Sequence, residues 1–187
     1  MISPRKALFA ASGCMFLYGV SRLIGRMDGQ YGPGLDWQLA HFAMVAGLLL
    51  LIPAVLGLGR ELRDVPGRNV AVVATFIGIF ASLVQFGVDI VAGLLAADKA
   101  DLSRLTSHVT GLPGFEFFFY QFGPQLMYLG LVVLTAMLAW ARKLPWWSPV
   151  LVFVGVLLPA LTLNLLPVAA ACLFVAYLPP ARKLVSA

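Results

Sequence analysis

Long stretches of apolar residues with almost no charge dominate this sequence, and they strongly limit what the chain can fold into. The stretches cover residues 7–25, 37–59, 70–97 and 116–140, followed by an apolar segment at 146–178. A helix that crosses a lipid bilayer needs about 20 predominantly apolar residues. Because 61% of the residues are hydrophobic and only 11% are charged, a soluble core of this size could not bury them. The sequence therefore predicts an all-α integral membrane bundle, with residues 1–187 forming a single domain.

The last apolar segment, residues 146–178, is too long for one span and barely long enough for two. About thirty residues in one helix would reach nearly 50 Å, against a hydrocarbon core of about 30 Å. A break is expected between Asn164 and Pro167, because Asn tolerates turns and Pro favours the first position of a helix. We therefore predict two short spans joined by a tight turn, which makes six transmembrane helices in all.

Two other segments need an interpretation. The first apolar run follows Arg5 and Lys6, as a leader peptide would, but it continues past Cys14 to the length of a span, so we expect it to be retained. In the loop at residues 98–115, Leu102 and Leu105 recur at helical spacing among polar residues. This pattern predicts a short helix that lies on the membrane surface.

The basic residues cluster between the apolar runs, and this placement predicts an orientation. Lys and Arg collect on the cytoplasmic side of a membrane protein. With six spans and a cytoplasmic N-terminus, nine of the 13 basic residues lie inside, whereas five spans would leave seven inside and six outside. The nine are Arg5, Lys6, Arg60, Arg63, Arg68, Arg142, Lys143, Arg182 and Lys183. We therefore predict a multi-pass plasma-membrane protein with both termini in the cytoplasm, and no nucleic-acid partner.

Polar side chains within the expected spans gather in the half of the bundle that this orientation places outward. Ionisable groups at membrane depth are unfavourable unless they face protein or water, so we expect these side chains to face the bundle interior. The candidate binding residues are Tyr18 and Arg22 in the first run, Gln38 and His41 in the second, Gln85 and Asp89 in the third, and Gln121 and Gln125 in the fourth.

Asp89 is the most informative of these residues. By the helical rise it lies roughly 10 Å from the outer end of its span, where a lone ionised carboxylate would cost several kcal/mol. We expect it to be neutral or paired, with Arg22, His41 and the two glutamines of the fourth run as partners. One interpretation is a structural latch that fixes the register of the helices. The other is an outward-opening polar pocket for a small ligand, a lipid head group or a proton, and both stay open.

No metal or cofactor is predicted. The only histidines are His41 and His108, whereas haem needs axial ligands, and a zinc set of these two with Asp89 and Glu116 lacks a ligand spacing. The expected partners are the lipid bilayer, a small apolar or amphipathic ligand, and a second copy of the chain.

Three classes of function fit this pattern. The absence of a nucleophile–base pair or a metal spacing favours a non-catalytic membrane protein with a structural, binding or accessory role. The second class is a membrane enzyme acting on an isoprenoid, quinone or lipid, with Asp89 or Glu116 as general acid. The third is a transporter, although the sequence shows no internal repeat of the kind on which many transporter folds are built.

Overall fold

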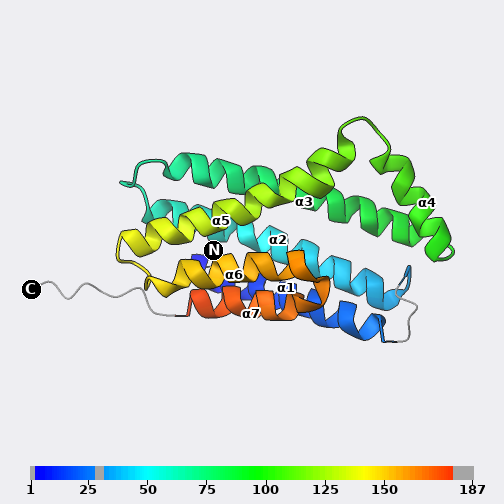
Figure 1. Cartoon of the computed structure of the whole chain (residues 1–187), viewed down its shortest axis with the longest axis horizontal. Helices are drawn as coiled ribbons and strands as arrows, with labels where there is room; N and C mark the ends of the chain where they lie inside the picture. The colour runs from blue at the N-terminus through cyan, green and yellow to red at the C-terminus, as the bar shows by residue number, and fades with distance from the viewer. Residues whose placement is uncertain (1–2, 28–31, 179–187) are drawn as a thin grey trace, which may run out of the picture.

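The structure is a computed structural model that describes residues 3–27 and 32–178, and within these ranges it is all-helical with no strand (Figure 1). Part of the glycine-rich loop, residues 28–31, and the basic pair Arg182 and Lys183 lie outside the described residues. The elements are α1 (Pro4–Gly25), α2 (Leu35–Glu61), α3 (Arg68–Leu95), α4 (Lys99–Thr110), the π-helix η1 (Glu116–Phe122), α5 (Gly123–Trp140), α6 (Trp147–Leu161), the 3₁₀ turn η2 (Leu163–Leu165) and α7 (Leu166–Ala176).

Four of the described helices are long and apolar enough to cross a membrane. They are α1, α2, α3 and the continuous helix Glu116–Trp140 that η1 and α5 form together. The expected break near Asn164 is present, because α6 ends at Leu161 and α7 begins at Leu166 after the turn η2. The two halves of this hairpin have 15 and 11 residues, so they are shorter than the usual length of a span.

The six main helices form a closed ring. Each packs against the next in the order α1, α2, α3, α5, α6, α7 and back to α1, and all run along the long axis of the molecule (Figure 1). The short helix that the spacing of the leucines at residues 98–115 predicts is present as α4, and it packs against α3 outside this ring. The core inside the ring is made of small and aliphatic side chains, among them Ala11, Leu48, Ile79, Leu131 and Leu134.

The outer surface of the ring is covered by large apolar side chains. Soluble proteins rarely expose a contiguous apolar patch larger than a few hundred Å². Here every main helix of the ring presents such residues, which include Leu17, Leu49, Phe80, Val91, Leu129, Leu157 and Val168. This surface fits hydrocarbon and not water, in agreement with the lengths of the four long helices.

Helices α3 and α5 approach each other closely at Gly78. A Cβ atom at this position would lie 2.0 Å from the backbone nitrogen of Met127, so only glycine fits. Close backbone approach through small residues is typical of helix packing in membranes, where dispersion contacts and hydrogen bonds replace the hydrophobic effect.

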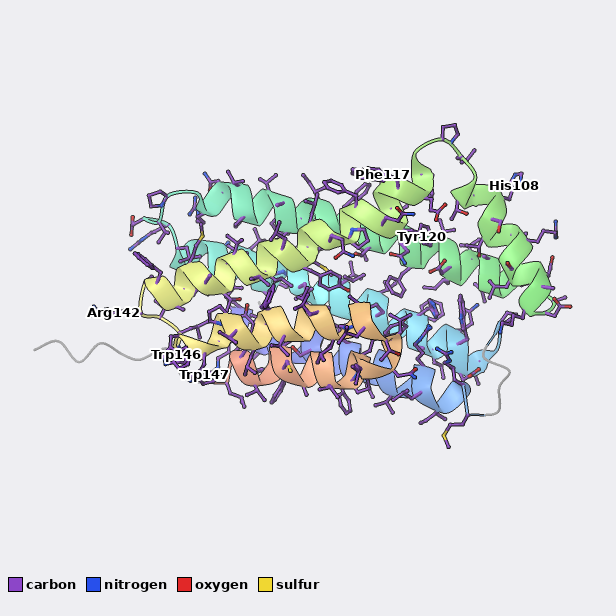
Figure 2. All side chains as sticks on the ribbon, in the orientation of Figure 1. His108, Phe117, Tyr120, Arg142, Trp146 and Trp147 are labelled. Carbon is purple, nitrogen blue, oxygen red and sulfur yellow. The ribbon has the colours of Figure 1, made fainter. Side chains whose placement is uncertain are left out.

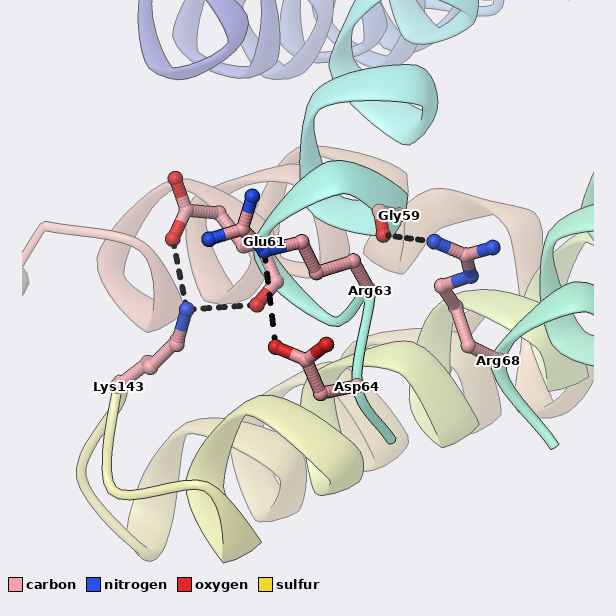
Figure 3. A network of polar contacts seen from close by, with 6 residues as sticks. All are labelled: Gly59, Glu61, Arg63, Asp64, Arg68 and Lys143. Atoms are coloured by element: carbon pink, nitrogen blue, oxygen red, sulfur yellow. Dashed lines mark hydrogen bonds and ion pairs between the residues drawn. The ribbon is translucent and has the colours of Figure 1, made fainter. Parts of the chain in front are cut away.

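Basic residues gather at one end of the bundle, which we call the basic end: Arg5, Lys6, Arg60, Arg63, Arg68, Arg142 and Lys143. The Lys143 ammonium group contacts Glu61 at 2.9 Å, and Arg68 donates to the Gly59 carbonyl at 3.2 Å (Figure 3). Trp146 lies beside Arg142 at the same end, whereas His108 lies near the opposite end (Figure 2). The exposed ring of Trp146 suits the boundary between membrane and water.

Candidate functional site

A cavity of about 440 Å³ lies inside the ring, in the half that is remote from the basic end. Six of the eight candidate binding residues line it: Tyr18, Arg22, His41, Gln85, Asp89 and Gln125. Its walls come from α1, α2, α3 and α5, while α4 contributes Leu102 and Thr106, and the tip of the α6–α7 hairpin contributes Pro159 and Leu163. Six segments of the sequence therefore meet at one space.

Asp89 faces this cavity and has a hydrogen-bond partner on the helix that forms the fourth expected span. The Tyr120 hydroxyl donates to Asp89 Oδ1 at 2.8 Å. The side chain of Asp89 is partly buried. A partner on the first, second or fourth span was expected, and the donor does lie on the fourth, but it is Tyr120 and not one of the two glutamines.

The π-helical start of the fourth long helix explains why Tyr120 reaches Asp89. Pro124 has no backbone N–H, and its ring clashes with the carbonyl of the residue four positions earlier in an α-helix. The Gly123 amide instead donates to Phe118, five residues back, which is the π-helical pattern. In this wider turn Tyr120, Pro124 and Gln125 line the cavity, while Gln121 is exposed on another face.

Aromatic rings form the wall between α1, α2 and α3. His41 is buried and stacks on Trp37, with ring centroids 3.6 Å apart. Tyr18 meets His41 edge-on at 5.7 Å and Phe86 edge-on at 5.5 Å. The Nδ1 atom of His41 lies 2.7 Å from the Trp37 carbonyl, which can only accept, so Nδ1 donates and Nε2 is left as the acceptor.

Arg22 brings a positive charge to the same space. It lines the cavity from α1, as does Tyr18, one turn below it on the same helix. Tyr18 and Asp89 line the same cavity. The cavity thus holds opposite charges that come from α1 and α3.

Three other predicted residues lie outside the cavity lining. Gln38 is buried, and its Nε2 donates to the Ile90 carbonyl at 3.3 Å, which ties α2 to α3. Gln121 is exposed and donates to the Glu116 carboxylate at 3.2 Å. Glu116, the second candidate general acid, is exposed, and it is not among the residues that line the cavity with Asp89.

The sequence analysis missed the contribution of the hairpin. Val156, Pro159, Ala160, Leu163 and Leu166 line the cavity, and they are apolar residues with no pattern that marks a site. Their role follows from the length of α6, which ends early and places its tip against the polar cluster. The short length of each half was visible in the sequence and is the one signal that pointed to this arrangement.

The two histidines do not meet at one site. His108 lies on α4 and borders a different cavity, between α3 and α4, together with Arg104 and Leu105. Among residues 3–27 and 32–178, no group of three His, Cys, Asp or Glu side chains is arranged to hold a metal ion.

Comparisons of the chain with models of protein families, with curated proteins and with solved structures find no match. The chemistry of the cavity is therefore the basis for a function.

Proposed function

We propose that this chain is a six-span plasma-membrane protein whose outward-facing cavity binds a small apolar or amphipathic ligand in a non-catalytic role. The observation that carries the proposal is the cavity of about 440 Å³ lined by Arg22, His41, Asp89 and Gln125. This volume lies within the usual range for small-molecule sites, which are concave and contain a few polar groups in a largely apolar wall.

Charge and connectivity support the orientation. The basic end carries most of the described Lys and Arg residues, so it is the end expected to face the cytoplasm. The α6–α7 hairpin starts at this end and returns to it, because Arg5 of α1 donates to the carbonyl of Leu178, just after α7. The cavity, at the other end of the bundle, then faces outward.

The accessible space around Asp89 favours a pocket over a purely structural latch. A latch would bring the polar side chains into direct contact and leave little volume between them. Here Gln125 is exposed although it lies at the start of α5 beside the buried Pro124, and Leu163 at the hairpin tip is 44% exposed. Both residues line the cavity, and their exposure supports a pocket that a small molecule can enter.

Cysteine labelling in intact cells tests this proposal. We expect Gln125→Cys, in a background with Cys14→Ala and Cys172→Ala, to react with a membrane-impermeant maleimide added outside, because thiolate formation needs water. The matched control is Leu129→Cys, one turn further along α5, which is 59% exposed on the apolar surface and should stay unlabelled. Labelling of Gln125→Cys only in broken cells would place the cavity on the cytoplasmic side, and no labelling at all would show that it is closed.

One observation favours a second candidate, a membrane enzyme acting on an isoprenoid, quinone or lipid. The Asp89 carboxyl lies in the cavity with the Tyr120 hydroxyl on one oxygen, a geometry in which it could transfer a proton to a bound substrate. For such an enzyme Asp89→Asn would retain binding and lose turnover. For a binding protein the same change would alter affinity alone.

A further inference from the structure

We infer that the occupant of the cavity is an amphiphile whose head carries both a phosphate and an ammonium group, with Arg22 at the phosphate, Asp89 at the ammonium, and the apolar chain against the α6–α7 hairpin tip. This inference rests on the proposed function, and it adds the chemical class of the ligand. It follows from the placement of charge, aromatic rings and apolar surface around the one space.

The two charges are held on different helices and point to a common space. Arg22 lies on α1 and Asp89 on α3, and both line the cavity. A guanidinium group is suited to phosphate because its N–H groups match two phosphate oxygens. A zwitterionic head presents an opposite charge to each of these two side chains, whereas a ligand with a single charge does so to only one of them.

The surroundings of Asp89 suit an ammonium group. Tyr120 donates to Oδ1, and in our proposal the ammonium group of the ligand contacts the second carboxylate oxygen. The rings of Tyr18, Phe86 and Tyr120 line the same cavity. Aromatic faces attract cations, and a carboxylate among aromatic rings is a recurrent way to bind amines and quaternary ammonium groups.

The hairpin tip provides the surface for a hydrocarbon chain. Helix α6 has 15 residues and α2 has 27, so at the helical rise α6 extends about 22 Å from the basic end and α2 about 40 Å. The tip therefore stops well below the other end of the bundle, at the level of Gly19 on α1. Its lining residues Val156, Pro159 and Leu163 are apolar, and they continue into the exposed surface at Leu161.

Trp37 gives a direct readout of binding. It lines the cavity and is one of four tryptophans. Trp146 and Trp147 lie at the basic end (Figure 2), and Trp140 ends α5, two residues before Arg142. The full chain with Trp140→Phe, Trp146→Phe and Trp147→Phe, held in amphipol, thus reports on the cavity alone. Four probes are dodecylphosphocholine, dodecyltrimethylammonium, dodecyl phosphate and dodecyl maltoside, each below its critical micelle concentration. The fifth probe is phosphocholine without a hydrocarbon chain.

We expect dodecylphosphocholine to bind about tenfold more tightly than dodecyl maltoside, the difference that a charge-assisted hydrogen bond provides. Asp89→Asn should weaken dodecyltrimethylammonium about tenfold and leave dodecyl phosphate unchanged, and Arg22→Gln should do the reverse. The matched controls are Asp64→Asn and Arg63→Gln, an exposed charge pair at the basic end, which should alter none of the affinities. Phosphocholine without a chain should bind much more weakly than dodecylphosphocholine, which identifies a membrane amphiphile and not a soluble zwitterion as the ligand class.

The other possible results contradict either this inference or the proposed function. Equal affinities for all four dodecyl compounds would show that the cavity binds hydrocarbon chains without distinguishing their head groups. That result would overturn this inference and leave the proposed function in place. Phosphocholine binding as tightly as its dodecyl form would overturn the role of the hairpin. If no probe changes the Trp37 emission while Gln125→Cys is labelled from outside, the ligand class is wrong, and if Gln125→Cys is also unlabelled, the proposed function itself fails. If a variant fails to fold, the affinities of the five probes for the protein with native Arg22 and Asp89 still test the inference.

Discussion

The Asp89 carboxyl group accepts a hydrogen bond from the hydroxyl group of Tyr120. A hydrogen bond at 2.8 Å stabilises the carboxyl group on one oxygen and holds the phenol ring at the cavity wall. Since a phenol is neutral, the pair adds no second charge that would have to be desolvated. Arg22 lines the same cavity from α1, so the guanidinium group and the Asp89 carboxyl group reach this space from different helices.

A double-mutant cycle measures this contact. We expect Asp89→Ala and Tyr120→Phe to lower the free energy of unfolding in detergent less when combined than the sum of their separate effects. The coupling energy should be about 0.6 kcal/mol or more, the usual value for a hydrogen bond between membrane helices. Additive effects would show that the two side chains do not interact.

Most of the polar cluster could be predicted from residue types and depth alone, because a polar side chain at membrane depth must face protein or water. The same reasoning could not choose between Gln121 and Tyr120. Spacing on a regular α-helix favours Gln121, which shares a face with Gln125, but the π-turn before Pro124 changes which residues share that face. Sequence periodicity assumes regular helices, so it fails where a proline widens the turn.

Among the helices, α4 is the one whose stability should depend on pH. Asp98 caps its first turn by accepting from the Asp101 amide at 2.9 Å, and Arg104 contacts the Asp101 carboxylate at 2.7 Å. The hydrogen bond from Arg104, followed by that from the Ala97 amide, holds the pKa of Asp101 below its ordinary value of 3.8. A carboxyl group with a lowered pKa stabilises the folded form above its unfolded pKa, and that contribution disappears as the pH falls through the lowered value.

We therefore expect α4 to loosen in acid. A spin label at Ser103→Cys, in the background without native cysteines, should become more mobile as the pH falls from about 5 to about 2.5. Asp101→Asn should have high mobility throughout and little dependence on pH. A label whose mobility does not change with pH in the native Asp101 background would contradict this role of the carboxylate.

The seam between α3 and α5 offers a second test at the level of elements. Gly78→Ala places a Cβ atom against the Met127 backbone, and overpacking of this kind costs about 1 to 3 kcal/mol. Gly87→Ala on the same helix meets nothing within 4 Å, so it should be neutral or stabilising by up to about 1 kcal/mol through helix propensity. Thermal unfolding of the two variants in detergent distinguishes them, and equal losses of stability would contradict the close approach.

At the scale of the whole molecule, the run lengths in the sequence predicted the four long helices, α4 and the broken hairpin, because each depends on local composition and spacing. The closed order of the ring could not be predicted in this way. The return of α7 to α1 depends on contacts between distant residues, such as Gly19 against Pro167 and Phe9 against Phe174. These contacts carry no signal in a single sequence, and they are what places the hairpin tip against the cavity.

The last prediction concerns the two sides of the membrane. Hydrogen bonds tie the end of the hairpin to the basic end, since Ser148 donates to the Ala176 carbonyl at 2.7 Å, Thr135 bonds to Tyr177, and Arg5 donates to Leu178. The start of α1 and the end of α7 must then lie on one side, whether the short hairpin crosses the membrane fully or only in part. We expect a fluorescent protein fused after Ala187 to be active in the cytoplasm, and alkaline phosphatase inserted in the loop at residues 111–114 to be active outside. Active phosphatase at Ala187 would contradict the return of the hairpin, and active phosphatase at neither site would contradict the outward orientation of the cavity.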